Sequence, residues 1–209
     1  MPTTPIARSK TAAMARIVDC VPRGYTRAIS GSVAASKARQ LAQKFHTNYG
    51  IACTPAQRLT RKGKGFANCV LVMYWPEGAA ERVEWVLLAT EGAGVETEAW
   101  RPLDAKPRLQ YLGYELVRHN EARGIRWTWR RPKDAMAEAH AVIRDLANRR
   151  NWESLGAYLQ TLANQPGFHG VRAQTWQLCQ EARARGYPCE TPHLFYVQKT
   201  SHGDPLSLT

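Results

Sequence analysis

A run of four cations and two glycines is the segment of this sequence best suited to chemistry. It reads Arg58-Leu59-Thr60-Arg61-Lys62-Gly63-Lys64-Gly65. Cationic side chains neutralise phosphate groups, and glycines let backbone N–H groups approach a phosphate chain closely. The run lacks the glycine and Gly-Lys-Ser/Thr spacing of a Walker A loop. It therefore predicts contact with a phosphate backbone, and the alternative is a solvated basic loop.

Positive charge is concentrated in the N-terminal part of the chain. The 209 residues carry a formal net charge of +12, and residues 1–75 hold 12 Lys or Arg with one acid, Asp19. A surface that carries mainly positive charge attracts a polyanion and makes its binding salt-dependent. We therefore expect a nucleic-acid partner, RNA or DNA. The predicted phosphate contacts are Lys37, Lys44, Arg58, Arg61, Lys62 and Lys64, aided by Arg126, Arg130, Arg131 and Arg172.

The same charge pattern leaves a second kind of partner open. Between Glu77 and Glu98 the chain has six acids and only Arg82 as a base. The basic surface could face an acidic protein, or the acidic segment of a second copy in a homo-oligomer. A binding regulator of that kind is an alternative to nucleic-acid binding.

His46 and Tyr49 form the second candidate site. His46 lies near the end of the first predicted helix, inside the basic region, and Tyr49 follows three residues later. Metal-independent ribonucleases need a positioned acid or base, such as histidine, and cations that stabilise the phosphorane charge. With Lys44, these residues predict an alternative function as a metal-independent endoribonuclease. A favourable contact with the helix dipole explains a histidine at this position equally well.

Two features of the C-terminal half could extend the basic surface. Alternation along residues 125–130 puts Trp127 and Trp129 on one strand face, expected in the core, and Arg126 and Arg130 on the other. The segment Gly167-Phe168-His169-Gly170 precedes a predicted helix with Arg172 in its first turn. The start of a helix can bind an anion, and the alternative is a plain helix connection with Phe168 as a hydrophobic staple.

The spacing of cysteines and histidines predicts neither a metal site nor a cofactor. The five cysteines, Cys20, Cys53, Cys69, Cys179 and Cys189, form no C-x-x-C pair, and no histidines have H-x-x-x-H spacing. We therefore expect reduced thiols that are mostly buried. No stretch approaches the ~20 consecutive apolar residues of a membrane span, and the first thirty residues lack the apolar core of a signal peptide. The sequence thus predicts a cytoplasmic protein that does not bind membranes.

The hydrophobic pattern predicts an α+β fold, in which hairpins build an antiparallel β-sheet next to one N-terminal helix and a C-terminal group of about three helices. Residues 1–13 read as a flexible tail and 14–209 as a single domain, with a basic half at 14–75 and a helical segment at 134–186. Short strands are expected at 15–21 and 24–30. One hairpin is expected to pair 66–75 with 82–90, and a second to pair 110–118 with 124–130. A last strand is expected at 193–199. The first helix is expected at 32–49 with Gly50 as its end, residues 54–65 as a loop or short helix, and later helices from Asp134, Trp152 and Gly170.

Three short segments resemble parts of uncharacterised accessory proteins of proteobacterial plasmids and integrative conjugative elements: Thr54–Asn68, Pro166–Gln174 and His193–Gly203. The resemblance implies a mobile genetic element, which suits nucleic-acid handling, and it assigns no catalytic residue. A looser similarity connects His46 and the glycine-bearing loop 63–65 with the Cas6-like endoribonucleases that process CRISPR RNA, and it implies metal-free RNA cleavage. A non-enzymatic nucleic-acid-binding accessory protein is the first hypothesis, and the ribonuclease is its alternative.

Overall fold

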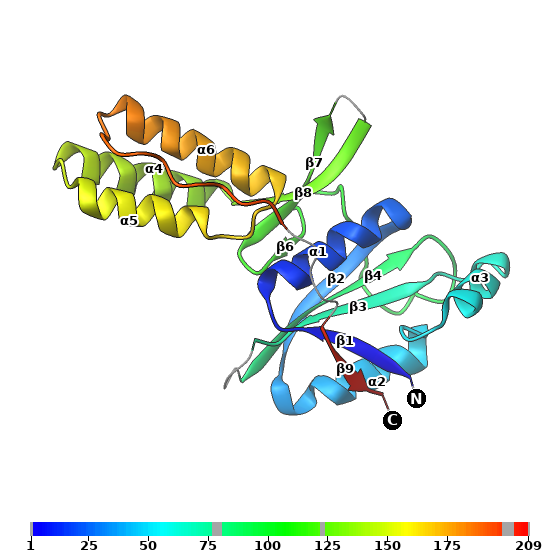
Figure 1. Cartoon of the computed structure of the whole chain (residues 1–209). Coiled ribbons are helices and arrows are strands. Elements are labelled where there is room, and N and C mark those ends of the chain that lie inside the picture. The colour runs from blue at the N-terminus through cyan, green and yellow to red at the C-terminus, as the bar shows by residue number, and fades with distance from the viewer. Residues whose placement is uncertain (1, 77–80, 122–123, 198–202, 209) are drawn as a thin grey trace. The chain divides into compact units, whose positions relative to one another are not determined.

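The computed structural model describes residues 2–76, 81–121, 124–197 and 203–208. Its contacts divide the chain into two compact units (Figure 1). The first unit comprises Met1–Leu112 and Thr200–Thr209, and the second comprises Gly113–Lys199. The predicted α+β class is confirmed, and the boundaries between the two units fall within the single domain expected over 14–209.

A six-stranded sheet forms the first unit. Its strands are β1 (Thr3–Ala7), β2 (Tyr25–Ala34), β3 (Cys69–Tyr74), β4 (Arg82–Thr90), β5 (Arg101–Pro102) and β9 (Asp204–Ser207), in the order β5-β2-β4-β3-β1-β9. β1 and β3 run parallel, and the other neighbours pair antiparallel. The expected hairpin of residues 66–75 and 82–90 is confirmed as β3 and β4. The short strand β6 (Gln110–Tyr111) comes later in this unit.

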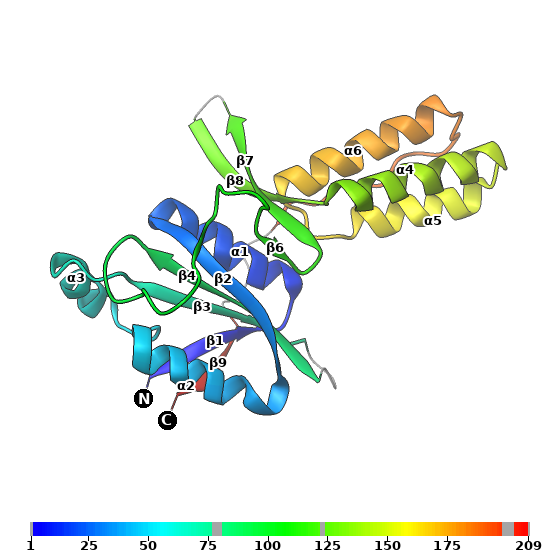
Figure 2. The same cartoon turned by 180° about the vertical axis from the view of Figure 1, so that it is seen from behind.

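Helices cover both faces of this sheet. Figures 1 and 2 show α1 (Lys10–Cys20) on one face and α2 (Ala38–Tyr49) on the other. In β3, Cys69, Leu71 and Met73 belong to the buried cluster that contains the α2 side chains, while Val70 and Val72, also buried, point to the opposite face. A strand covered on both sides loses the apolar–polar alternation. This explains the unbroken apolar run of β3.

The first twenty residues differ from the sequence-based prediction. Residues 3–7 form β1 between β3 and β9, where a flexible tail was expected, and α1 occupies most of the strand expected at 15–21. α1 begins after Ser9, whose hydroxyl accepts a hydrogen bond from the Ala12 N–H at 3.1 Å. It buries Met14 and Ile17 on one side, at the spacing of a helical face.

The two helices between β2 and β3 carry four of the six basic residues predicted in the first unit. α2 begins at Ala38, after β2 and a short 3₁₀ turn at Ala35–Lys37, and it ends at Gly50 as expected. Gly50 adopts the left-handed conformation, φ +63°, and its N–H donates to the His46 carbonyl oxygen. The basic run 58–64 belongs largely to a helix, α3 (Pro55–Gly63), whose start is fixed by a capping box of Thr54 and Gln57.

The second unit joins a β-hairpin to three helices. Its elements are β7 (Tyr114–Glu121), β8 (Gly124–Arg130), α4 (Lys133–Asn148), α5 (Trp152–Ala163) and α6 (His169–Ala184). Ile143, Leu155 and Leu178 are fully buried where the helices meet, so the expected three-helix segment is confirmed. α4 begins after Pro132, with Asp134 inside its first turn. Residues 193–197 form no strand, and the rest of the strand expected at 193–199 lies outside the described residues.

Candidate functional site

A cavity of about 820 Å³ in the first unit collects four cationic side chains from three separate segments. Arg16 comes from α1, Arg23 from the 3₁₀ turn η1 (Val21–Arg23), and Arg58 and Lys62 from α3. Among the described residues, Glu91 is the one acid that lines the same cavity. We call this cavity the basic pocket.

The basic pocket lies where three strands of the sheet begin or end. Tyr25 and Thr26 open β2, Thr90 closes β4, and Asn68 immediately precedes β3, and all four line the cavity. Arg58 and Lys62 lie four residues apart on α3 and so project from the same side of that helix. The capping box that starts α3 thus sets the direction in which both cations point.

Arg58 is held in place by neutral acceptors. Its Nη1 donates to the Tyr25 hydroxyl at 2.9 Å, its Nη2 to the Ile51 carbonyl oxygen at 3.1 Å and its Nε to the Cys53 carbonyl oxygen at 3.1 Å. Burial raises the pKa of Tyr25, which keeps the phenol neutral. Since none of these partners is an acid, they do not compensate the positive charge of Arg58 at the pocket.

The other three cations are uncompensated as well. Among the described residues, Arg16, Arg23 and Lys62 form no ion pair. The single acid of the pocket is engaged elsewhere, since Glu91 lies 3.4 Å from the Arg27 guanidinium and accepts from the Thr26 hydroxyl at 2.7 Å. The pocket therefore presents a concentrated positive potential that suits an anionic ligand.

Two buried polar atoms of the residues lining the pocket have no hydrogen-bond partner. They are Nε of Arg16 and Oδ1 of Asn68. Asn68 is only 8% exposed, and its Nδ2 donates to the Arg58 carbonyl oxygen at 3.0 Å. Buried polar groups in proteins almost always have a partner, and an unpaired one costs about 1–3 kcal/mol. Both atoms are closed off from solvent, so they belong to the wall of the pocket and are not exposed to a ligand inside it.

The remaining basic residues predicted in the first unit divide into two kinds. Arg61 donates through Nε and Nη2 to the Ala67 carbonyl oxygen and lies over the Phe66 ring, so it holds the loop that follows α3. Lys37, Lys44 and Lys64 are exposed, and Lys44 lies 3.8 Å from the Glu98 carboxylate. Lys37 and Lys64 form no ion pair among the described residues.

Arg16 and Arg23 were not among the residues singled out from the sequence. Arg58 lies 42 positions after Arg16 in the chain, and no local motif connects them. The one signal available was the excess of cations in residues 1–75, which does not say which cations meet. The structure brings them together because the second half of α1 and one side of α3 lie beside the start of β2.

His46 and Tyr49 both have partners that belong to the fold. The His46 Nδ1 accepts from the Ala52 N–H at 3.4 Å. The Tyr49 phenol is buried and lies 2.6 Å from the Thr97 hydroxyl and 3.1 Å from the Glu98 carboxylate. Neither side chain lines the basic pocket.

In the second unit, Arg131 is buried where a phosphate-binding side chain was expected. It is 5% exposed, and its guanidinium donates to Gln165, to Thr175 and to the carbonyl oxygens of Leu162 and Val171. Arg131 therefore joins the hairpin to the helices and is not available to a ligand.

Its neighbours in β8 differ from one another. Arg130 pairs with Glu115 at 3.3 Å, and Arg126 is exposed. Trp129 is fully buried, as predicted, whereas Trp127 is half-buried under the Arg118 guanidinium.

The segment 167–170 serves the packing of the second unit. A side chain at Gly170 would approach the Trp129 carbonyl oxygen to 2.5 Å, so only glycine allows α6 to start this close to β8. Its N–H donates to the Thr128 hydroxyl at 3.1 Å. Arg172 donates to the Leu194 carbonyl oxygen and lies 3.4 Å above the Tyr196 ring, so it fixes residues 194–196 against α6.

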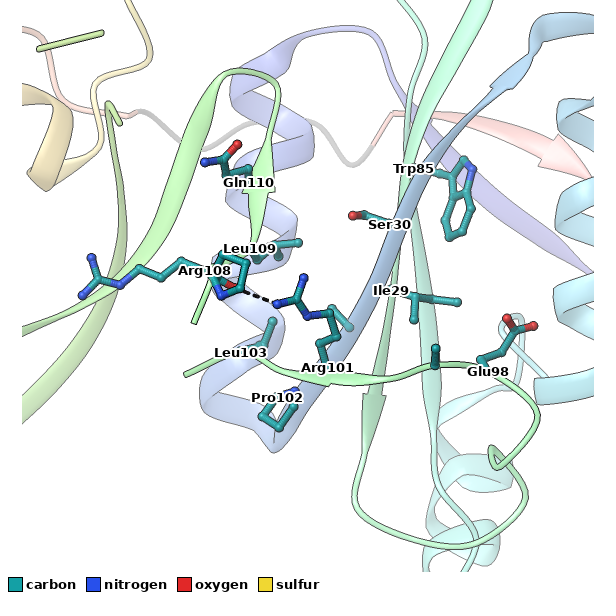
Figure 3. Close-up of a pocket in the computed structure, with 13 residues that line it drawn as sticks. Ile29, Ser30, Trp85, Glu98, Arg101, Pro102, Leu103, Arg108, Leu109 and Gln110 are labelled. Carbon is teal, nitrogen blue, oxygen red and sulfur yellow. Dashed lines mark hydrogen bonds between the residues drawn. The ribbon is translucent and has the colours of Figure 1, made fainter. Parts of the chain in front are cut away.

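A second cavity of the first unit lies beside β2 and β5 and is shown in Figure 3. Its volume is about 620 Å³, and both charge signs line it, with Arg101 and Glu98 beside the apolar Trp85 and Leu103. Arg101 donates to the Pro107 carbonyl oxygen at 3.4 Å (Figure 3). This mixed lining suits a phosphate less well than the basic pocket does.

Within the part of the chain that the structure describes, no three His, Cys, Asp or Glu side chains are grouped to hold a metal ion, and no helix could cross a membrane. Comparisons with known family models, with curated proteins and with solved structures found no match. The geometry of the basic pocket is therefore the basis for a functional proposal.

Proposed function

We propose that this chain is a cytoplasmic nucleic-acid-binding accessory protein that grips the phosphate backbone through the basic pocket and the exposed lysines of its first unit. The observation that carries the proposal is the convergence of Arg16, Arg23, Arg58 and Lys62 on one cavity whose only acid already pairs with Arg27. The resemblance of three segments to plasmid and conjugative-element proteins suggests where such a protein would act.

Physical chemistry supports a polyanion as the partner. Each cation that neutralises a phosphate releases a condensed counterion, which favours binding and makes it salt-dependent. Arg58 is held in place before any ligand arrives, so little conformational entropy is lost when a phosphate binds there. Contacts of this kind do not distinguish sequences, so the proposed binding is general rather than sequence-specific.

A salt-titrated binding assay with single-stranded RNA, single-stranded DNA and duplex DNA tests the proposal. Arg16→Gln and Lys62→Gln should each weaken binding to every sequence and lower the salt slope by about 0.7–0.9 per lost phosphate contact. Arg39→Gln is the matched control. Arg39 is an exposed cation on α2 that does not line the pocket, and its replacement by glutamine removes the same charge.

Two results would overturn the proposal. One is an absence of salt-dependent binding to any probe near physiological salt, which would favour an acidic protein as the partner of the basic surface. The other is equal binding by Lys62→Gln and Arg39→Gln, which would show that net charge matters and the pocket does not. The products are run on a denaturing gel in EDTA, so metal-free RNA cleavage would be seen in the same assay.

A further inference from the structure

We propose that the second unit carries a surface on which the bases of a single-stranded nucleic acid stack. The surface consists of three aromatic side chains, Trp176, Phe195 and Tyr196, and we call it the aromatic platform. The inference rests on the proposed function and specifies the form of the nucleic acid, a single strand whose base faces are accessible. Single-stranded RNA and single-stranded DNA share this chemistry.

The three side chains of the aromatic platform are exposed. Trp176 is 51% exposed, Phe195 59% and Tyr196 71%. Burial of an aromatic ring is strongly favourable, so large aromatic side chains that stay in solvent as a group mark a binding surface, whereas single exposed ones are common. In the described part of the chain, the other exposed large hydrophobic side chains are Leu59 and Phe66, both in the first unit. The exposed aromatic surface of the second unit thus comes from α6 and from the segment after it.

Contacts around α6 bring the three side chains to one place. The chain reverses after α6 and runs back along it (Figure 1). Arg172 lies one turn before Trp176 on the same face of the helix, and its guanidinium carbon lies 3.4 Å from the centre of the Tyr196 ring. The Phe195 ring contacts the His193 ring edge-on, with 4.6 Å between their centres. Arg172, Trp176 and His193 line one cavity of about 760 Å³, so the aromatic platform borders a space open to a ligand.

The main chain that carries two of the platform residues is fixed before any ligand binds. The Leu194 carbonyl oxygen accepts from Nε of Arg172 at 3.2 Å, and the Val197 N–H donates to the Gly167 carbonyl oxygen at 3.2 Å. A Cβ atom at Gly167 would approach the Phe195 carbonyl oxygen to 2.1 Å, so glycine is required for this close contact. Because the segment is already ordered, stacking a base on it costs less conformational entropy.

The charges beside the aromatic platform favour a nucleic acid over an apolar peptide. Arg172 forms no ion pair among the described residues, and Glu190 is the one acid among the described residues that line the cavity. Proteins that bind single strands combine aromatic rings with cations, because the ring stacks on a base and the cation attracts the phosphate backbone. In a duplex the base faces are covered by neighbouring bases, which restricts such a surface to single strands.

The test measures binding of the full chain to four labelled probes of equal length, by fluorescence anisotropy over a range of salt concentrations. The probes are single-stranded RNA, single-stranded DNA, a DNA strand whose nucleotides lack bases, and duplex DNA. A duplex carries the higher charge density, so a basic surface alone would bind it at least as tightly as a single strand. We expect the base-bearing single strand to bind about tenfold more tightly than the abasic strand, which corresponds to ~1.4 kcal/mol, and more tightly than the duplex.

Variants of two platform residues separate stacking from charge. Trp176→Leu and Tyr196→Leu keep an apolar side chain and remove the flat ring. Each should weaken binding of the base-bearing strand about fivefold at every salt concentration, and leave the salt slope and the affinity for the abasic strand unchanged. Tyr196→Phe keeps the ring and is the matched control, which should bind as the parent protein does. Loss with the RNA probe, the DNA probe or both assigns the aromatic platform to that strand type.

Three results would count against these proposals in different ways. Leucine variants that bind every probe as the parent does would overturn this inference, leave the proposed function standing and make a protein the better candidate for this surface. A loss in Tyr196→Phe equal to that in Tyr196→Leu would also overturn stacking, since the ring is still present. Failure of the parent protein to bind any probe would overturn both this inference and the proposed function.

Discussion

The side chain of Asn68 donates to the main-chain carbonyl oxygen of Arg58 at 3.0 Å, which ties the start of β3 to α3 at the wall of the basic pocket. The Arg58 side chain continues the network to Tyr25 at the start of β2 and to the loop before α3. Three segments that are distant in sequence are thereby fixed to one another without a ligand. Arg58 is both a cation of the pocket and a structural bond of the first unit.

Removing the Arg58 guanidinium should therefore cost stability as well as binding. We expect Arg58→Gln to lower the free energy of unfolding by about 2–4 kcal/mol, because two carbonyl oxygens and a buried phenol lose a charged donor. Urea denaturation measures the change. Lys62→Gln, an exposed neighbour on the same helix, should stay within about 0.5 kcal/mol of the parent protein. Equal stability of the two variants would contradict the structural role of Arg58.

The basic pocket could be predicted from the sequence only in part. The cations of the 58–64 run were visible because they are adjacent in the chain, yet the sequence does not show that Arg61 turns inward to Ala67 while Lys62 lines a cavity. That difference depends on helical phase, since neighbouring residues on α3 point about 100° apart. Arg16 reaches the pocket only through tertiary packing, which no local pattern encodes.

The N-terminal elements were also hard to predict, because their structure depends on partners that are distant in the sequence. Residues 3–7 include a proline and pair with β9 about 200 positions later, so nothing nearby in the sequence marks them as a strand. A strand was expected at 15–21, but the spacing of Met14, Ile17 and Cys20 fits a helix that lies on the sheet. The later hairpins and the three helices were predictable because their partners are close in the chain.

Arg131 should be a main stabiliser of the second unit. Its replacement by methionine keeps an unbranched apolar side chain but leaves the Leu162 and Val171 carbonyl oxygens without their buried donor. We expect Arg131→Met to lower the thermal unfolding midpoint and to cost about 3 kcal/mol. Arg144→Gln, an exposed arginine on α4 of the same unit, is the matched control and should change stability by less than about 0.5 kcal/mol. A stable Arg131→Met protein that binds nucleic acid less tightly would instead restore Arg131 to the binding surface.

His46 should act on the structure of the α2 end rather than on RNA. We expect His46→Ala to lower the free energy of unfolding by about 0.5–1.5 kcal/mol, since the Ala52 N–H loses its acceptor. RNA incubated in EDTA with either protein should remain intact on a denaturing gel. Cleavage by the parent protein that disappears in His46→Ala would favour the metal-independent ribonuclease instead, with His46 as its acid or base.

Cys69 should make the protein less stable in alkali. Burial raises the pKa of its thiol from 9.0 to about 12. Between these values the unfolded chain loses the proton and the folded chain keeps it, so stability falls as pH rises, by about 1.4 kcal/mol per pH unit for this thiol. Burial raises the pKa of Cys20 and Cys179 in the same direction. Urea denaturation from pH 8.5 to 10.5 should show this decline and a shallower one in Cys69→Ala. Cys189→Ala, which removes an exposed thiol, should show the same decline in stability as the parent protein. A Cys69→Ala slope equal to that of the parent would show that the Cys69 thiol ionises as readily in the folded chain as in the unfolded one.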